Sequence, residues 1–428
     1  MNRLVTVREY ARLTTDSVLC DLDNAQVSES AFDWLCKLSE SFNKSGAVLL
    51  HVEGRRSLRW DSYVGLIETP CGTKLEILPK HIEAGDCRKT SRALLRKMIQ
   101  AALRIKPREA GITALQLYDA PLTEWVMAQF LSELDYLIKR GVRFDFHRIE
   151  DEQRFLRGQL NTVAQMRQPL GRQQYFQLRH DAFLPDRAEN RLLKLALEQV
   201  CRSTQDADNW RLANELRSLL REIPCSYQVR KDFRAWQTDR LMAHYVSIRP
   251  WCELVLNQQM PLALEGAWQG VSLLFPMEKL FENYVEAFFR KRLEHGATLR
   301  APARSEHLCQ HQNNPWFRLE PDFLIRFQGR EWVLDAKWKC LDTRTSENKY
   351  GLNQSDFYQL FAYGHKYLNG EGELVLIYPR RQLFQETLQP FHFGSGLTLW
   401  VVPFDLETDE LVGLQPEKLA ALLANKFE

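Results

Sequence analysis

Three side chains in one stretch of the sequence could together carry out hydrolytic chemistry. Asp322 and Asp335 flank two apolar runs, Phe323-Leu324-Ile325 and Trp332-Val333-Leu334, and Lys337 follows two residues after the second aspartate. One or two carboxylates can hold Mg²⁺, and a bound metal ion can acidify a water molecule that attacks a phosphodiester. A nearby ammonium group can orient that water or neutralise the developing negative charge. These residue types therefore indicate metal-assisted phosphodiester hydrolysis.

A β-hairpin is the element that must bring these groups together. The dipeptide Gln328-Gly329 between two runs of β-favouring residues predicts a two-residue turn. With that turn, Asp322 lies directly opposite Asp335, with Cβ atoms roughly 5 Å apart. Lys337 projects from the same face as Asp335, because side chains alternate along a strand. The alternative interpretation is an ordinary surface hairpin that carries a cross-strand charge cluster.

The pattern of Pro321-Asp322, a strand, and then Asp335-x-Lys337 resembles the PD-(D/E)xK nuclease superfamily. This resemblance implies a Mg²⁺ cofactor, for which Mn²⁺ would substitute, held by the two aspartates. It also implies a third carboxylate from the preceding helix. Residues 275–294 have apolar side chains at helical spacing, and Glu282 on this predicted helix is the candidate ligand. A solvated helix charge is the alternative reading of Glu282.

A second predicted helix, residues 354–368, follows the hairpin. Gln359 and Tyr363 are four residues apart and therefore share one helix face. They resemble the Gln-x-x-x-Tyr element of RecB-type nucleases, which helps to hold DNA near the metal. Together with Lys339 they are the predicted DNA-binding residues, although Tyr363 could instead belong to the core. Predicted strands at 373–378 and 397–402 complete an α/β sheet covered by helices.

Length and pattern predict an α+β multidomain protein. A chain of 428 residues suggests about three domains. We expect a β-rich N-terminal region with some helices in residues 1–150. A helical middle domain should occupy residues 151–265, with an extended segment at 143–149 before it. The resemblance to PD-(D/E)xK nucleases implies that residues 266–428 form a C-terminal α/β restriction-endonuclease-like domain.

Charge gives one local signal for nucleic acid. The net charge is only +2, so any DNA contact must come from a local patch. Residues 88–108 contain eight basic side chains and no acidic one, and such a run could meet phosphates or an acidic partner. A solvated helix face is the alternative explanation of this run.

The cysteines and the hydrophobic pattern predict a cytoplasmic protein. The nine cysteines are scattered and never spaced C-x-x-C, which indicates free thiols in a reducing compartment. No apolar run is long enough to predict a membrane span, and the first residues do not resemble a signal peptide.

Beyond the hairpin, nearly the whole chain resembles the McrC family, the nuclease subunits of McrBC modification-dependent restriction systems. The catalytic motif is the most specific part of the resemblance. Other matching segments are Val7-Arg8-Glu9-Tyr10, Leu75-Glu76-Ile77-Leu78-Pro79-Lys80, Lys139-Arg140-Gly141, Leu156-Arg157-Gly158-Gln159-Leu160, Glu189-Asn190-Arg191-Leu192-Leu193, Leu280-Phe281-Glu282-Asn283-Tyr284 and Tyr358-Gln359-Leu360.

The resemblance implies a McrB-like AAA+ GTPase hexamer as partner and double-stranded, modified DNA as substrate. The N-terminal part would dock on the ring and stimulate its GTP hydrolysis, while the C-terminal part cuts DNA. The sequence has no G-x-x-x-x-G-K-[ST] loop, so we expect no nucleotide to bind this chain itself. Two other functions stay open: a non-catalytic regulatory or assembly subunit of an AAA+ motor, and a stand-alone RecB-like repair nuclease.

Overall fold

The structure of the protein is a computed structural model that describes residues 4–44, 48–80, 87–103, 121–172, 174–256, 272–394 and 396–414, together with 419 and 423. Tertiary contacts divide the chain into two compact units, and each is described separately. The first consists of Met1–Leu122 with Gln259–Glu428, and the second is Thr123–Gln258. The three domains proposed from the sequence stay a prediction, and their boundary at 265–266 lies outside the described residues.

In the residues that the structure describes, the N-terminal part of the first unit contains two small sheets and two helices. The first sheet has the strand order β1-β7-β6-β11, and the second has the order β3-β2-β5-β4. The elements are β1 (Leu4–Arg8), β2 (Arg12–Thr14), β3 (Asn24–Gln26), α1 (Glu29–Lys44), β4 (Leu50–Gly54), β5 (Ser57–Trp60), β6 (Tyr63–Glu68), β7 (Lys74–Leu78), α2 (Arg88–Ala102) and β11 (Ser272–Pro276).

The pairing of β11 with β6 joins the two chain segments of the first unit, Met1–Leu122 and Gln259–Glu428. At Gly65 the backbone has φ +131°, and an added Cβ would lie 1.8 Å from the carbonyl oxygen of Leu273. Only glycine fits this close approach of two strands. The pairing matters for the site because β11 leads directly into the helix that carries Glu282.

The C-terminal part of the first unit is a mixed sheet with helices packed against it. The strand order is β12-β15-β16-β17-β19-β18, and β20 pairs with β19. The elements are α10 (Met277–Arg292), β12 (Thr298–Arg300), β13 (His307–His311), β14 (Asn314–Arg318), β15 (Phe323–Phe327), β16 (Arg330–Ala336), η3 (Ser346–Gly351), α11 (Gln354–Tyr367), β17 (Gly372–Pro379), β18 (Phe391–Phe393), β19 (Leu397–Asp405) and β20 (Glu410–Leu411).

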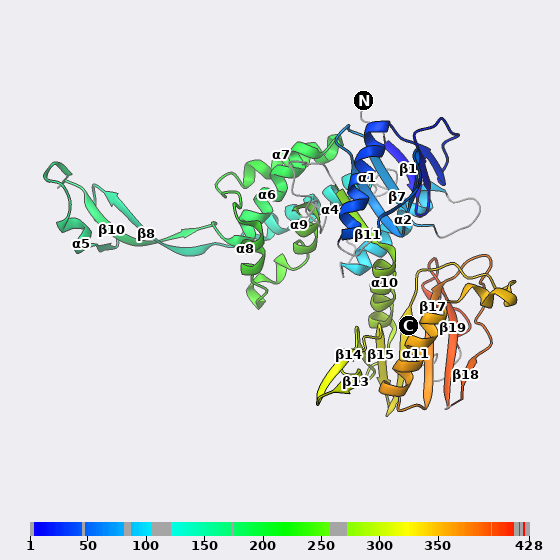
Figure 1. The fold of residues 1–428 in the computed structure, drawn as a ribbon. Helices are drawn as coiled ribbons and strands as arrows, with labels where there is room; N and C mark the ends of the chain where they lie inside the picture. The colour runs from blue at the N-terminus through cyan, green and yellow to red at the C-terminus, as the bar shows by residue number, and fades with distance from the viewer. Residues whose placement is uncertain are drawn as a thin grey trace. The chain divides into compact units, whose positions relative to one another are not determined.

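Strands β16, β17 and β19 run parallel, so their carboxyl ends meet at one edge of the sheet. Helix α11 packs against β16 and β17. Figure 1 shows this helix in orange, next to β17. Its buried Leu360, Tyr363 and Tyr367 join Leu374 and Leu399 from the sheet in one apolar core. The predicted helices at 275–294 and 354–368 and the predicted strands at 373–378 and 397–402 are therefore confirmed as elements.

The second unit is a group of helices with an antiparallel sheet, β8-β10-β9. Its elements are α4 (Leu122–Arg140, whose first residue belongs to the first unit), β8 (Asp145–Gln153), β9 (Gln159–Leu160), α5 (Thr162–Met166), η1 (Leu170–Arg172), β10 (Phe176–Leu184), α6 (Ala188–Ser203), α7 (Ala207–Leu219), α8 (Val229–Ala235), η2 (Arg240–Tyr245) and α9 (Arg249–Leu256).

Strands β8 and β10 form a long ribbon that extends away from the helices of the same unit (Figure 1). The sequence predicted mostly helix after residue 150, and for residues up to 184 this was wrong. The ribbon is largely solvent-accessible, so its strands lack the alternation of apolar and polar residues that marks a half-buried strand. The extended segment predicted at 143–149 is confirmed as the start of this ribbon.

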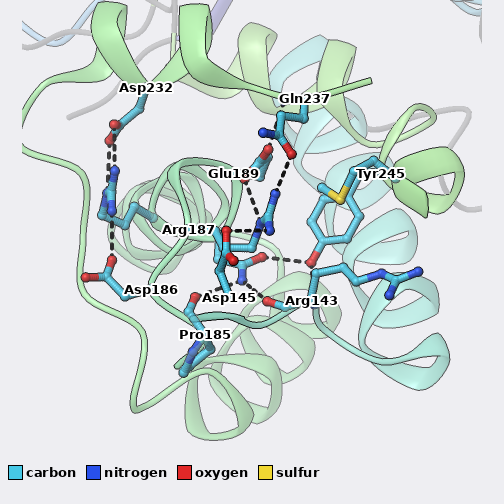
Figure 2. Close-up of polar contacts among 12 residues, drawn as sticks. Arg143, Asp145, Pro185, Asp186, Arg187, Glu189, Asp232, Gln237 and Tyr245 are labelled. Carbon is cyan, nitrogen blue, oxygen red and sulfur yellow. Dashed lines mark hydrogen bonds and ion pairs between the residues drawn. The ribbon is translucent and has the colours of Figure 1, made fainter. Parts of the chain in front are cut away.

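A polar network holds the base of the ribbon to the helices, as Figure 2 shows. Arg187, just after β10, contacts Asp145 at the start of β8 (Nη1–Oδ2 3.0 Å) and donates to Gln237 Oε1 (2.9 Å). The Tyr245 hydroxyl donates to Asn190 Oδ1 (2.8 Å) and accepts from the backbone N–H of Arg143 (2.9 Å). Both strands are therefore fixed at the point where they leave the helices.

Among the residues that the structure describes, no helix combines the length and the apolar character required to span a lipid bilayer.

Candidate active site

The hairpin of β15 and β16 has the predicted turn and register. Gln328 and Gly329 both have positive φ, +47° and +79°, as the favoured two-residue hairpin turn requires. Phe323 pairs with Leu334 and Phe327 with Arg330. This register places Asp322, one residue before β15, opposite Asp335.

The hairpin brings Asp322, Asp335 and Lys337 to the end of the sheet. Asp322 Oδ2 accepts a hydrogen bond from the backbone N–H of Ala336 at 2.9 Å, which ties it to β16 next to Asp335. Asp335 is 1% exposed, and its Oδ2 lies 2.6 Å from the Nζ of Lys337. The three residues predicted for catalysis therefore form one cluster.

The electrostatics of this cluster favour a cation. Burial, together with the negative charges of Asp335 and Glu282, raises the pKa of Asp322 to about 8. Burial also raises the pKa of Asp335, against the influence of the Lys337 ammonium. For Lys337, burial alone would lower the pKa, but the adjacent Asp335 carboxylate moves it above its usual value, so the side chain stays an ammonium ion.

Helix α10 supplies a third carboxylate near the two aspartates. Its apolar residues recur at helical spacing and are buried, which orients the helix on the sheet: Met277, Leu280, Phe281, Tyr284, Val285 and Phe289. Glu282 is half-buried and pairs with Lys279 (Oε2–Nζ 2.5 Å). Because the charge of Glu282 contributes to the raised pKa of both Asp322 and Asp335, the helix brings this carboxylate within electrostatic reach of the cluster.

With this geometry established, comparison with known proteins identifies the family. The family model of the McrBC 5-methylcytosine restriction system component matches residues 58–379, which include every site residue named above. The chain belongs to this McrBC family.

Solved structures show the same fold. A chain of the refined half-complex from the tetradecameric assembly of Thermococcus gammatolerans McrB AAA+ hexamers with bound McrC is similar with a TM-score of 0.69, 19% identity and 94% coverage of each chain. A chain of the Thermococcus gammatolerans McrBC complex is similar with a TM-score of 0.52 and 19% identity, covering 68% of this chain and 88% of that one. Among curated proteins, no match was found.

The predicted DNA-binding residues of this McrBC-family chain have unequal access to solvent. Gln359 and Lys339 are exposed, whereas Tyr363 is 3% exposed and lies in the core. Gln359 Nε2 donates to the Tyr363 hydroxyl at 2.5 Å. Burial and the nearby Asp335 raise the pKa of Tyr363 to about 12. Direct contact of DNA with Tyr363 stays a prediction, and the burial of Tyr363 disfavours it. The hydrogen bond between Tyr363 and Gln359 suits a role of Tyr363 in positioning the Gln359 side chain.

The structure also brings to this cluster three residues that sequence reasoning did not assign. Partial burial raises the pKa of Glu278, while the Lys337 charge opposes the shift. The charge of Asp356, on the first turn of α11, raises the pKa of Asp335 and of Glu278. Tyr378, at the end of β17, donates to Asp356 Oδ2 at 3.3 Å. For Tyr378 the order strand, helix, strand from β16 to β17 was the available signal, because the ends of parallel strands meet at one edge.

The basic run at 88–108 is only partly described, since Arg104, Lys106 and Arg108 lie outside the described residues. Arg92 donates to both oxygens of the buried Glu76, at 2.8 and 2.6 Å. Lys97 Nζ contacts Asp409 Oδ1 (2.7 Å) and the carbonyl oxygen of Leu406 (2.9 Å). Arg96 is buried. Arg92 and Lys97 contact groups inside the first unit and Arg96 is buried, so these three cations do not form a free phosphate-binding face.

The residues present fit a hard divalent cation. Among the described residues, no three His, Cys, Asp or Glu side chains are grouped closely enough to hold a metal by themselves. Mg²⁺ does not need three, because it binds through one or two carboxylates and keeps waters or substrate phosphate oxygens as its other ligands. Two adjacent carboxyl groups with raised pKa, one of them almost fully buried, are suited to such an ion.

Proposed function

We propose that this chain is the endonuclease subunit of a McrBC-like restriction complex and hydrolyses phosphodiester bonds of DNA with Mg²⁺. The arrangement of Asp322, Asp335 and Lys337 at the end of one hairpin carries this proposal. The mixed sheet with α10 and α11 is then a PD-(D/E)xK domain. Membership of the McrBC family supports the restriction role.

In this mechanism Asp322 and Asp335 would hold the metal ion, and Glu282 would be a third ligand once its carboxylate is free of Lys279. When bound, the ion supplies Lewis acidity that lowers the pKa of a water and stabilises charge on the phosphate. Lys337, kept as an ammonium by Asp335, orients the attacking water and neutralises the developing oxyanion. One such site cuts one strand, so a double-strand break needs two copies.

DNA placement falls to exposed residues around this centre. Gln359 on α11 and Lys339 just after the catalytic lysine are exposed and suit contacts with phosphate oxygens. Tyr363 holds the Gln359 side chain through its hydroxyl. We expect Gln359→Ala and Lys339→Ala to weaken DNA binding more than they slow the bound reaction.

We further propose that a McrB-like AAA+ GTPase is the partner. One matched structure is a half-complex of McrB AAA+ hexamers with bound McrC, the other is a McrBC complex, and this chain shares their fold. The sequence lacks a nucleotide-cradling G-x-x-x-x-G-K-[ST] loop, so GTP is expected to bind the partner.

The test compares Asp335→Ala and Lys337→Ala with Arg330→Ala, an exposed residue at the other end of β16. With the partner ring, GTP, Mg²⁺ and methylated DNA, the first two variants should lose cleavage but still bind the ring and stimulate its GTPase. Arg330→Ala should cleave like the wild type. Retained cleavage in Asp335→Ala or Lys337→Ala would overturn the site. Cleavage by the wild type without a ring would favour a stand-alone nuclease. If the wild type cleaves DNA under no condition, the result would favour a non-catalytic assembly subunit.

A further inference from the structure

A buried carboxylate of the N-terminal sheet contacts the chain directly beside the catalytic lysine. Glu9 follows β1, and its side chain is 0% exposed. Its two carboxylate oxygens accept hydrogen bonds from the indole Nε1 of Trp338 at 2.9 and 3.0 Å. Oε1 also accepts from the backbone N–H of Lys80, after β7, at 2.7 Å. Trp338 is the residue after Lys337, so the contact reaches the end of the catalytic strand.

Trp338 is held on its other sides as well. The indole is 4% exposed and lies 5.4 Å from the ring of Phe281, centroid to centroid, on α10. The guanidinium of Arg381 lies over the indole, 5.3 Å from its centroid. Phe281 precedes Glu282 on α10. The indole therefore joins the segment that presents Lys337 to the helix that presents Glu282.

We propose that Glu9 is a positioning residue of the nuclease site, which fixes the Trp338 indole and thereby the backbone that presents Lys337 to Asp335. This inference rests on the proposed function, because it assigns Glu9 a role in the same reaction. It implies that the N-terminal sheet completes the active site of the C-terminal sheet within one unit.

The backbone geometry explains how Glu9 would act at a distance. The N–H of Lys337 donates to the carbonyl oxygen of Ile377 at 2.8 Å, so the chain still follows β17 at this residue. Successive side chains of an extended chain point to opposite faces. Lys337 thus reaches Asp335 on one face while Trp338 reaches Glu9 on the other. A displacement of about 1 Å at a catalytic group can lower a rate about 100-fold. An indole that keeps the Lys337 backbone in place would therefore help to maintain the cleavage rate.

The chain contains a matched control for this contact. Trp332, on the same strand β16, is 2% exposed, and its indole Nε1 donates to Glu373 Oε2 at 3.0 Å. It lies near the start of β16, while Trp338 follows the end of that strand. Trp338→Phe and Trp332→Phe therefore each delete the hydrogen bond of a buried indole to a carboxylate, at opposite ends of β16.

The experiment measures single-turnover cleavage of methylated DNA by the complete complex for the wild type, both Trp→Phe variants, Glu9→Leu, Glu9→Gln and the Glu9→Leu/Trp338→Phe double variant. We expect Trp338→Phe and Glu9→Leu each to lower the rate at saturating DNA by about tenfold to 100-fold. The DNA concentration that gives half the maximal rate, and the stimulated GTPase rate, should change less than about twofold, a free-energy difference well under 1 kcal/mol.

Three comparisons separate positioning from a loss of stability. The double variant should be no slower than the slower single variant, because both deletions remove one interaction. Glu9→Gln should cleave at close to the wild-type rate, because its amide oxygen still accepts the indole N–H. Trp332→Phe should cleave at the wild-type rate. This should hold even if its unfolding temperature is lowered as much as that of Trp338→Phe.

The inference is overturned if Trp338→Phe cleaves at the wild-type rate, or if Trp332→Phe loses as much cleavage as Trp338→Phe. It is also overturned if the Glu9 and Trp338 losses multiply in the double variant. If the wild type cleaves and Lys337→Ala does not, the proposed function stands whatever these variants do. If the wild type does not cleave, the proposed function and the inference fall together.

Discussion

Lys279 and Glu282 form an ion pair on α10, with Nζ 2.5 Å from Oε2. The same Glu282 carboxylate contributes to the raised pKa of Asp322. If the aspartates hold the proposed metal ion, Glu282 has two possible cationic partners: Lys279, which it contacts, and that ion. It cannot give the same oxygen fully to both.

This competition predicts opposite effects on metal affinity. Glu282→Gln should raise the Mg²⁺ concentration for half-maximal cleavage by about tenfold, the equivalent of 1.4 kcal/mol for one lost ligand. Lys279→Gln should lower that concentration by about twofold to fivefold, the range expected for an exposed ion pair. Both shifts can be measured by Mg²⁺ titration of the cleavage rate.

The next ion pair on α10 provides the control for this titration. Arg290 Nε contacts Glu286 Oε1 at 2.7 Å, on the same helix. Glu286→Gln and Arg290→Gln should leave the Mg²⁺ dependence unchanged. An unchanged Mg²⁺ dependence in Glu282→Gln would exclude Glu282 as a ligand.

Removal of Arg92 should destabilise the first unit. The side chain of Glu76 is 0% exposed. Among the donors in the described residues, Arg92→Met leaves its carboxylate with the Thr6 hydroxyl alone, at 3.0 Å. Breaking a buried ion pair on one side costs about 3–5 kcal/mol. Urea unfolding measures the loss. Arg88→Met, at an exposed position of the same helix, should change the unfolding free energy by less than about 0.5 kcal/mol. Similar values for the two variants would contradict the prediction.

The Tyr245 hydroxyl should stabilise the base of the ribbon in the second unit. It donates to Asn190 and accepts from the backbone of Arg143, and Tyr245→Phe leaves both groups without this partner. The expected loss is about 1–3 kcal/mol. Tyr227→Phe, where the side chain is 93% exposed, is the matched control and should be neutral. Equal unfolding temperatures for the two variants would show that the hydroxyl contributes nothing.

Glu9 should make the stability of the first unit depend on pH. Burial raises the pKa of Glu9 from 4.5 to about 7, although the Lys80 N–H, the Trp338 indole and the charges of Arg381 and Lys80 oppose the shift. The protonated form is therefore favoured by folding. This contribution to stability is fully present below pH 4.5 and is lost as the pH rises through about 7, in total on the order of 3 kcal/mol.

Glu9→Gln checks this pH dependence directly. The variant should remove this decline between pH 5 and 8, so that it gains stability over the wild type as the pH rises. Unfolding free energies measured at several pH values give the two slopes. Parallel curves for wild type and variant would show that Glu9 is ionised across the whole range.

The hairpin could be predicted to single-residue register because its information is local. A two-residue turn at Gln328-Gly329 fixes every cross-strand pair, and the apolar runs on both sides identify the strands. Helices α10 and α11 were also predictable, since each buries a regular apolar stripe. These local patterns were enough to bring Asp322, Asp335 and Lys337 together.

The remaining features depend on contacts between distant segments. Nothing near Glu9 in the sequence indicates that it accepts a hydrogen bond from Trp338, 329 residues away. The pairing of Arg92 with Glu76 likewise could not be separated from a solvated basic face by charge spacing alone. The β8–β10 ribbon escaped prediction because strands accessible to solvent show no apolar alternation.

The first unit is interrupted by the second, and this order affects synthesis on the ribosome. Strand β6 is translated about 200 residues before β11, its antiparallel neighbour in the β1-β7-β6-β11 sheet. Until β11 emerges, the edge of β6 offers unpaired N–H and C=O groups to other nascent chains. The second unit, being continuous, can fold during that interval. Slow translation after the second unit would therefore prolong the time during which a chaperone must shield the unfinished sheet.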